Sequence, residues 1–154
     1  MGVSLPPMGL RFEHFDPGVA EAFVRINESQ PGLPRFLGLR IDTIEAGRLV
    51  ASLEAKEEFR NPFGTMHGGI LAGMVDHVLA AVLYPVIPRG YWAASTEFKL
   101  NYLAPVRSGT VTAEATVISL TKRTAVVRVD VTNEGRAVAA AQGTVLIQEP
   151  KPAG

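Results

Sequence analysis

The sequence predicts an α+β fold in which one long helix packs against a single antiparallel sheet of about six strands. A helix-length apolar run covers residues 68–86, and only Asp76 and His77 interrupt it with side chains that can be charged near neutral pH. Four segments rich in Val and Thr then follow one another and are joined by short turns, which is typical of antiparallel strands. The helix and the sheet are therefore expected to bury each other's apolar faces.

Composition sets the class of protein. The length of 154 residues fits one domain, expected to span residues 1–154 with a flexible N-terminal arm and C-terminal tail. Fifteen basic and fifteen acidic residues give no net charge, and Lys and Arg form no cluster of the size that binds nucleic acid. The chain has no cysteine, which excludes disulfides, thiolate metal sites and thiol catalysis. Because no charged leader with a following apolar segment opens the sequence, we expect a cytoplasmic protein.

Before the long helix, the pattern predicts a loose arm, a short helix and a hairpin. Residues 1–12 contain Pro and Gly and have no period. A helix is expected to begin at Pro17, with Asp16 as its N-cap, and to end before Pro31. Apolar side chains alternate on both sides of Gly47, which predicts two strands joined by a turn. The predicted strands of the whole sheet cover residues 36–45, 49–55, 93–103, 109–120, 124–132 and 137–148.

The long helix has two different faces. One face carries the large apolar residues Leu71, Met74, Val75, Val78, Leu79 and Val82. The opposite face combines small residues with one acid, namely Gly69, Ala72, Gly73, Asp76 and Ala80. A helix that is apolar nearly all round must be enclosed by protein, so we expect Asp76 to be buried where another backbone comes close. The polar interruptions, and Pro85 at the end, indicate a core helix of about 17 to 20 residues rather than a membrane span.

The start of this helix is the first candidate site. His67, Gly68 and Gly69 lie where the loop meets the helix, and the glycines leave the first unpaired backbone N–H groups uncovered. Donors at the positive end of a helix dipole suit the negative charge that develops on a carbonyl oxygen under attack. The alternative is that the glycines only permit close packing of the helix on the sheet.

Asp76 is the second candidate. A carboxylate inside an apolar helix costs several kcal/mol unless it is paired, hydrated or used, which makes Asp76 a candidate general base. The alternative is that it only hydrogen-bonds a neighbouring backbone group. His77 projects about 100° away around the helix, and we expect it to be structural.

The spacing of the two candidates predicts an oligomer. Asp76 follows Gly68 by eight residues, which is about 12 Å along one helix. A base and an oxyanion donor must both reach one carbonyl group, within about 3 to 3.5 Å of the reacting atoms. One helix does not supply both. If two copies pack these helices antiparallel across a two-fold axis, the Gly68 end of one approaches Asp76 of the other, and a homodimer holds two identical sites.

Two more polar residues complete the candidate site. Asn61 precedes Pro62, and its amide either forms a turn, which is the commoner role, or orients Asp76 or a water molecule. Ser95 opens the strand after the helix and is either a structural residue or part of the site.

A resemblance to a known family rests on one pattern of residues. The pattern is Asn61-x-x-Gly64-x-x-His67-Gly68-Gly69, then Asp76, then Ser95-Thr-Glu-Phe-Lys-Leu-Asn-Tyr-Leu-Ala-Pro105. It resembles the hotdog-fold acyl-CoA thioesterases, in particular the phenylacetic-acid-degradation (PaaI-like) branch, over residues 33–148. The resemblance implies a long helix wrapped by a curved sheet, homodimers with a continuous sheet, and often homotetramers.

The resemblance also implies roles for single residues. In that family an Asp from the neighbouring subunit acts as general base or nucleophile, which implies this role for Asp76. The Gly68 N–H would polarise the thioester carbonyl, while His67, Asn61 and Ser95 would position substrate or water. The expected substrate-binding residues are Gly69, Thr96, Arg107, Lys122 and Arg123, of which the basic ones would meet the phosphates of coenzyme A. The spacing leaves open whether Ser95 or Thr96 faces the site.

The predicted function is hydrolysis of an acyl-CoA to the free acid and coenzyme A, with no cofactor or metal. One alternative is an acyl-CoA-binding module without turnover. Another is a hotdog-fold enoyl-CoA hydratase or dehydratase, which would pair His67 with Asp76. The acyl group is not specified, and the apolar residues that would line its pocket also fit a plain core: they are Phe63, Met66, Leu83, Tyr84, Trp92 and Phe98.

Overall fold

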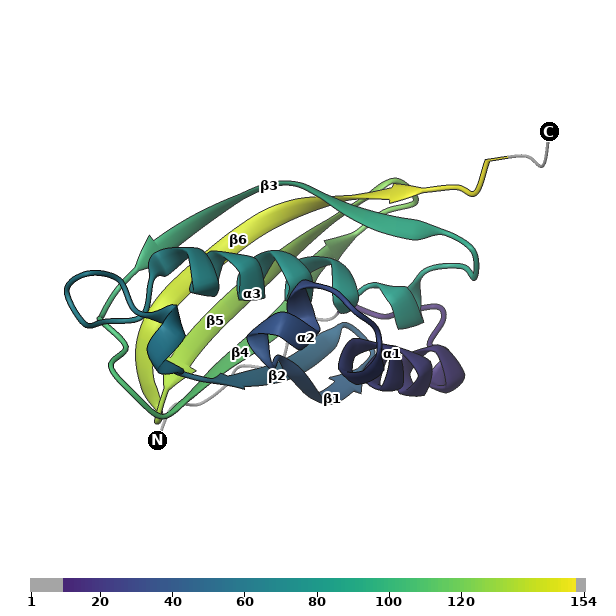
Figure 1. Cartoon of the computed structure of the whole chain (residues 1–154). Coiled ribbons are helices and arrows are strands. Elements are labelled where there is room, and N and C mark those ends of the chain that lie inside the picture. Colours follow the sequence, from purple (N-terminus) through teal and green to yellow (C-terminus); the bar gives the residue numbers. More distant parts are fainter. Residues whose placement is uncertain (1–9, 152–154) are drawn as a thin grey trace.

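A curved, six-stranded antiparallel sheet wraps around the helix α3 in the computed structural model, which describes residues 10–151 (Figure 1). The strands are β1 (Arg40–Glu45), β2 (Arg48–Glu54), β3 (Trp92–Tyr102), β4 (Thr110–Leu120), β5 (Thr124–Asn133) and β6 (Arg136–Gln148). The helices are α1 (Pro17–Ser29), α2 (Leu33–Leu37) and α3 (Gly68–Ala81), with short 3-10 helices η1 (Glu57–Phe59) and η2 (Tyr84–Val86). The predicted α+β architecture is confirmed.

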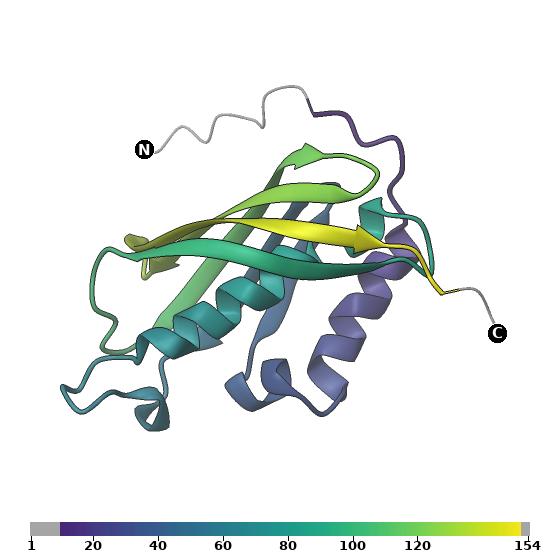
Figure 2. The ribbon, with the colours of Figure 1, turned by 90° about the horizontal axis from the view of Figure 1, so that it is seen from above.

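The strand order β1-β2-β4-β5-β6-β3 explains why α3 lies where it does. β2 and β3 are consecutive strands in the chain, yet β4, β5 and β6 separate them in the sheet. The connection must cross the face of the sheet, and α3 makes this crossing on the concave side (Figure 1). β3 runs beside β6 at the rim of the sheet (Figure 2), and no strand of residues 10–151 pairs with its outer edge.

The inner face of the sheet is made of small side chains where α3 lies. Ala113 and Ala115 on β4, and Ala141 and Gly143 on β6, are all buried. They let the helix come close, so that its large side chains fill the remaining space. The predicted buried face of the helix is confirmed, since Leu71, Met74, Val75, Val78, Leu79 and Val82 are buried. Burying each of these side chains is worth about 1.5–3 kcal/mol.

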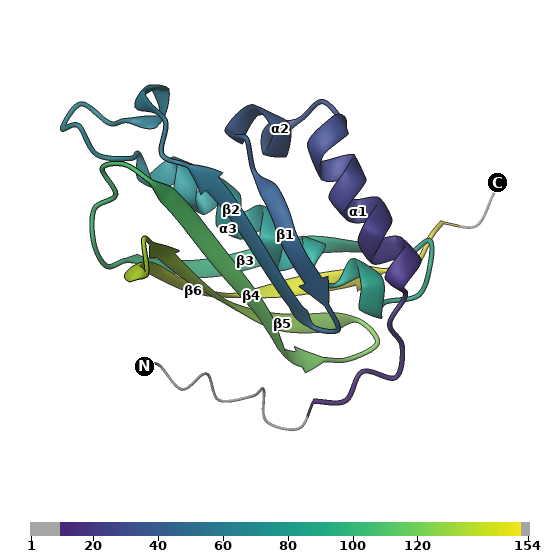
Figure 3. The same cartoon turned by 90° about the horizontal axis from the view of Figure 1, so that it is seen from below.

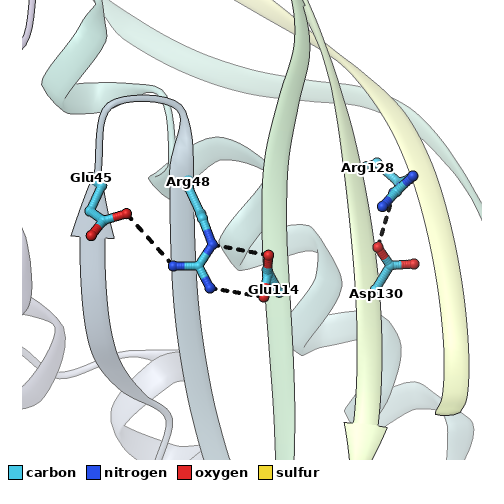
Figure 4. A network of polar contacts seen from close by, with 5 residues as sticks. All are labelled: Glu45, Arg48, Glu114, Arg128 and Asp130. Carbon is cyan, nitrogen blue, oxygen red and sulfur yellow. Dashed lines mark hydrogen bonds and ion pairs between the residues drawn. The ribbon is translucent and has the colours of Figure 1, made fainter. Parts of the chain in front are cut away.

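The outer face of the sheet carries a network of charged side chains (Figure 4). Arg48 on β2 donates two hydrogen bonds to Glu114 on β4, both 3.0 Å long, and lies 3.7 Å from Glu45. Arg128 pairs with Asp130 on β5 at 2.9 Å. These pairs are partly exposed, so each contributes at most about 1 kcal/mol to stability. Because these side chains make the outer face polar, the helix packs on the concave face.

α1 lies beside β1 (Figure 3), and hydrogen bonds hold both of its ends. At its start, Asp16 accepts from the Val19 N–H at 3.1 Å and from Arg89 Nε at 2.7 Å. The hydrogen bonds from Arg89 and Val19 lower the pKa of Asp16 to about 2. Near its end, the buried Asn27 donates to the carbonyl oxygen of Leu39 at 2.6 Å. α1 is therefore a fixed part of the fold.

The chain encloses α3 on one flank only, which corrects the expectation that it is buried all round. α2 covers Gly73, where an added Cβ would lie 3.4 Å from Leu33 and 3.8 Å from Leu37. Further round the helix, Gly69 and Asp76 are exposed. The small face is thus divided between a flank covered by α1 and α2 and an open flank toward β3.

The predicted strand over residues 36–45 is wrong in its first part. Leu33–Leu37 form α2, and β1 begins only at Arg40. Pro34 fits the first turn of a helix, and Gly38 ends the helix in the left-handed region with φ of 68°. The alternating apolar side chains that predicted the strand are buried all the same, namely Leu37, Leu39 and Ile41.

The central helix is shorter than predicted. α3 has 14 residues, and the chain tightens into the 3-10 helix η2 around Pro85. By length and composition the stretch Gly68–Val86, with a mean hydropathy of 1.6, is apolar enough to cross a membrane. Its large side chains are buried against the sheet, so it is the core helix that the sequence predicts.

Residues 1–9 of the expected loose arm, and residues 152–154 of the expected frayed tail, lie outside the described residues. Where the arm is described, Leu10 and Phe12 pack against the core. The turn between β1 and β2 makes room for the Phe12 ring, because a Cβ on Gly47 would overlap it. This end of the arm therefore lies against the sheet.

The close approach of α3, β3 and β6 can be tested at Gly143. A Cβ there would lie 2.6 Å from the Glu97 carbonyl oxygen, 2.7 Å from Phe98 Cβ and 3.1 Å from Leu79 Cδ1. Gly143→Ala is expected to lower the free energy of unfolding by about 1–3 kcal/mol, because two of these neighbours lie on the backbone or next to it. Urea denaturation measures the change, and Gln142→Ala, at an exposed neighbouring position, is the control. Equal stability of both variants would contradict this packing.

Candidate active site

The candidate residues lie in two separate hollows along α3. The first, of about 460 Å³, lies at the helix start and is lined by Asn61, Thr65, Met66, Gly68, Leu71, Tyr102, Leu103, Ala104, Pro105 and Val106. The second, of about 360 Å³, lies beside the middle and end of the helix and is lined by Phe23, Asp76, His77, Ala80, Ala81, Tyr84, Ala93 and Ser95. The structure thus brings Asn61 together with Gly68, and Asp76 together with Ser95.

At the start of α3, one of the two glycine N–H groups already donates a hydrogen bond. His67 is the N-cap of α3, and its Nδ1 accepts from the Gly69 N–H at 2.9 Å. The His67 ring therefore carries its proton on Nε2 when neutral. The expected substrate-binding role of Gly69 conflicts with this bond. Gly68 is the first residue of the helix, and its N–H has no acceptor within the helix. Gly68 is the backbone donor that remains at this end.

Tyr102 contacts the backbone of Gly68, and the sequence reasoning missed this contact. Its hydroxyl donates to the Gly68 carbonyl oxygen at 2.9 Å. A Cβ on Gly68 would lie 2.8 Å from the Tyr102 ring, so glycine is needed for the ring to lie there. Tyr102 belongs to the Tyr-x-x-Pro sequence of the family pattern, which was the available signal for it.

Asn61 shapes the loop that leads to the helix. Its Oδ1 accepts from the N–H groups of Phe63 at 2.9 Å and Thr65 at 3.2 Å, and its Nδ2 donates to Thr65 Oγ1 at 2.8 Å. The turn-forming role that the sequence left open is the one observed. The amide is engaged within its own loop, and it lines a different hollow from Asp76. Within this chain Asn61 acts on the site by fixing the approach to Gly68.

Asp76 is exposed, so the expectation that the chain buries it is wrong. The helix pattern correctly placed it among small residues, but the neighbours around it do not enclose it. No hydrogen bond joins its side chain to another residue between positions 10 and 151. The carboxylate faces the open flank of α3, beside Ser95 of β3, and is accessible to a ligand.

Ser95, rather than Thr96, lines the Asp76 hollow. The pairing of β3 with β6 shifts between Ser95 and Glu97, so Thr96 is the extra residue of a bulge. The Thr96 hydroxyl donates to the Thr144 carbonyl oxygen at 3.0 Å. Ser95 lies two residues after Ala93, so strand alternation puts both on the face that lines this hollow, which answers the question that the spacing left open.

His77 links α3 to α1. Its Nε2 lies 2.8 Å from Oδ1 of Asn27, whose amide nitrogen already donates to Leu39. His77 must therefore be the donor. Burial lowers the pKa of His77, and the nearby Asp76 opposes this shift. The expectation that His77 is structural agrees with this bond.

The basic candidates lie at opposite ends of β4. Arg107 precedes the strand, whereas Lys122 and Arg123 follow it in the turn to β5. The 11 residues of β4 lie between the two groups and span about 36 Å. Lys122 lines a third hollow, of about 650 Å³, with Arg11 and Arg89. Within residues 10–151, no three His, Asp or Glu side chains are grouped to hold a metal ion.

The expected acyl-lining residues are scattered. Tyr84 lines the Asp76 hollow, and Met66 lines the Gly68 hollow. Leu83 is fully buried in the core, whereas Phe63 is 88% exposed on its loop. The remaining two, Trp92 and Phe98, lie on β3 outside both hollows. Phe23 of α1 lines the Asp76 hollow and was missed, because no local signal connects α1 with α3.

A model of the thioesterase superfamily matches residues 63–140, slightly more than half of the 154 residues. The chain belongs to the thioesterase superfamily. The matched region begins in the loop before α3 and ends within β6, and α1, α2, β1 and β2 precede it. It contains every residue predicted for catalysis except Asn61, which lies two positions before it.

Two relatives and one solved structure place this thioesterase more closely. It is 32% identical over 103 residues to the 1,4-dihydroxy-2-naphthoyl-CoA hydrolase of Listeria monocytogenes, covering 67% of this chain and 84% of that protein. It is 31% identical over 112 residues to acyl-coenzyme A thioesterase 13 of Homo sapiens, covering 71% and 79%. The PaaI protein from the phenylacetic acid degradation operon of E. coli matches with a TM-score of 0.78 at 21% identity, covering 86% and 96%. The predicted hotdog fold and thioester hydrolase class are confirmed.

The His77–Asn27 bond predicts how stability of the thioesterase depends on pH. Because burial lowers the pKa of His77 below its ordinary 6.5, the unfolded chain binds this proton more readily than the folded chain. Stability is then complete above pH 6.5 and falls as the pH decreases toward the lowered pKa, by at most about 1.4 kcal/mol per pH unit.

His77→Gln keeps a hydrogen-bond donor and removes the titration. Its free energy of unfolding should therefore fall less than that of the parent between about pH 7 and pH 5. Urea denaturation at several pH values measures the difference, with His14→Gln, at an exposed position, as the control. Parallel curves for parent and His77→Gln would show that His77 does not carry this dependence.

Proposed function

We propose that this thioesterase hydrolyses acyl-CoA to the free acid and coenzyme A at two identical sites, each shared between the two chains of a homodimer. One observation carries the proposal. The two groups that we assign to the chemistry, the Gly68 N–H and the Asp76 carboxylate, line separate hollows along the same helix. Two relatives whose names give CoA thioesters as substrates support the choice of acyl-CoA.

The open flank of α3 offers a surface for the second chain. Gly69 and Asp76 are exposed along this flank, and β3 beside it has no neighbour on its outer edge within the described part of the chain. Large apolar side chains are exposed at both ends of β3, namely Trp92, Tyr102 and Leu103. Such an apolar border fits a protein interface. Antiparallel packing of two α3 helices brings Gly68 of one chain toward Asp76 of the other.

In the proposed reaction, Gly68 and Asp76 act on opposite sides of the thioester carbonyl. The Asp76 carboxylate takes a proton from water as the water oxygen bonds to the carbonyl carbon. The negative charge that forms on the carbonyl oxygen is stabilised by the Gly68 N–H at the positive end of α3. The intermediate collapses, the C–S bond breaks, and the departing sulfur takes the proton to give coenzyme A and the acid. Direct attack by Asp76, with hydrolysis of the resulting anhydride, needs the same two groups.

The hydratase alternative requires His67 close to Asp76. In the shared site, His67 next to Gly68 of one chain would approach Asp76 of the other, but its Nδ1 is already engaged by the Gly69 N–H. A binding module without turnover has no use for a free carboxylate beside Ser95. Assembly into homotetramers and a cytoplasmic location stay predictions of the sequence.

Replacing Asp76 tests the proposed base. Asp76→Asn keeps the shape of the side chain and removes its basicity, so kcat for acyl-CoA hydrolysis should fall by about 10²–10⁴-fold. Release of free thiol measures the rate, and urea denaturation checks that the variant is folded. The mechanism would be wrong if the folded variant hydrolysed acyl-CoA as fast as the parent.

Replacing Gly68 by Pro tests the proposed donor. Proline is favoured at the first helical position, and the extended backbone of His67 (φ −63°, ψ 131°) suits a residue before proline. Gly68→Pro removes the N–H and should lower kcat by about 10²–10³-fold. Gly68→Ala is the matched control, because both variants push against Tyr102 and only the alanine keeps the donor. An equal loss in both would assign the effect to Tyr102 instead.

Mixing the two inactive variants tests whether the site is shared. After unfolding and refolding together, half of the dimers should be mixed, and each mixed dimer would hold one intact site, giving about a quarter of the parental activity. If each chain instead used its own Gly68 and Asp76, a mixture of Asp76→Asn and Gly68→Pro would stay inactive. The mixture therefore separates a shared site from a site within one chain.

A further inference from the structure

The hollow beside Asp76 ends at two stacked aromatic rings. Phe23 of α1 and Tyr84 of η2 both line it, with ring centres 4.6 Å apart and planes inclined by 24°. Tyr84 also accepts from the Ala93 N–H of β3 at 3.3 Å through its hydroxyl. The aromatic pair therefore joins α1, η2 and β3 across the end of the hollow.

Phe23 cannot easily withdraw, because α1 is held on both sides of it. Before it, the Asp16 N–H donates to the Pro85 carbonyl oxygen at 2.8 Å, and Asp16 pairs with Arg89 at 2.7 Å. After it, Asn27 accepts from His77 at 2.8 Å. Moving the Phe23 ring away would break contacts to η2 or to α3, so the pair forms a fixed wall rather than a mobile lid.

The helix provides a measure of the space between this wall and Asp76. Tyr84 follows Asp76 by eight residues. The part within α3, from Asp76 to Ala81, rises about 7.5 Å, and the turn to Tyr84 adds up to about 6 Å, so the distance along the chain axis is about 12 Å. Ala80 and Ala81 lie between them and leave the hollow open along this length. An extended covalent chain advances roughly 1.2 Å per bond, since a three-bond peptide residue spans at most about 3.6 Å. After contact distances of about 3 to 3.5 Å at both ends, about 5 Å remains, which is room for roughly four to six carbon atoms.

The geometry points to Phe23 as the residue that limits the length of the acyl group, an inference that rests on the proposed function. Acyl groups of about four to six carbon atoms, or with one aromatic ring, fit between Asp76 and the Phe23–Tyr84 pair, and long-chain acyl groups meet the wall. Aromatic rings also gain from packing against other rings. α1 precedes the region that matches the superfamily, so Phe23 comes from the N-terminal segment, whereas Tyr84 lies within the matched region.

Phe23→Ala tests the inference with hexanoyl-CoA, phenylacetyl-CoA and palmitoyl-CoA as substrates. The parent should give a kcat/KM for palmitoyl-CoA at least about tenfold below that for hexanoyl-CoA, because groups that do not fit a pocket lose binding energy in the transition state. Phe23→Ala opens the wall and should raise the palmitoyl to hexanoyl ratio of kcat/KM at least about tenfold. Ile26→Ala is the matched control, since Ile26 lies on the same helix, is 50% exposed and does not line the hollow.

A second variant covers the case in which Phe23→Ala does not fold. Ala80→Leu fills the hollow from the helix side and should lower the ratio of kcat/KM for hexanoyl-CoA to that for acetyl-CoA at least about tenfold. The inference is overturned if the parent accepts palmitoyl-CoA as well as hexanoyl-CoA, or if a folded Phe23→Ala or Ala80→Leu leaves its ratio unchanged. A parent that releases no coenzyme A from any of these substrates contradicts the proposed function itself, which distinguishes the two failures.

Discussion

The close packing of α3 on the concave side of the sheet is the constraint on which the rest of the structure depends. Small residues such as Ala113 and Gly143 let the helix approach, and the large side chains of its inner face fill the space that remains. Because the helix must cross from β2 to β3, this packing also fixes where its ends lie. Gly68 and Asp76 then take positions along one rigid rod, in separate hollows beside β3.

The two flanks of α3 differ in what covers them. α1 and α2 cover one flank and attach to it through Asn27, His77 and the contact of Leu33 with Gly73. The other flank is left open and carries the carboxylate. This division explains how a helix that is apolar nearly all round can hold an accessible acid. α1 and α2 cover the flank that has no predicted catalytic residue, and the flank that carries Asp76 stays uncovered.

Periodicity predicted most of the fold, because strand alternation and the face of a helix are local properties of the sequence. It failed where two structures share one pattern, as with Leu37 and Leu39, which are buried equally well by a helix end and by a strand. Within the candidate site, Gly68, Asp76 and Ser95 were predicted from their residue types and spacing. The exposure of Asp76, and the contacts of Tyr102 and Phe23, depend on elements far apart in the chain, which spacing does not reveal.

The bulge at Thr96 has a consequence for solubility. A long, regular strand edge is a template on which further strands can add without limit. In β3 the regular ladder is interrupted between Ser95 and Glu97, which increases the local twist and divides the edge into two shorter regular stretches, residues 92–95 and 97–102. At the opposite rim of the sheet, α1 lies beside β1 (Figure 3). Both rims are therefore poor starting points for fibril growth, although one of them carries exposed aromatic side chains.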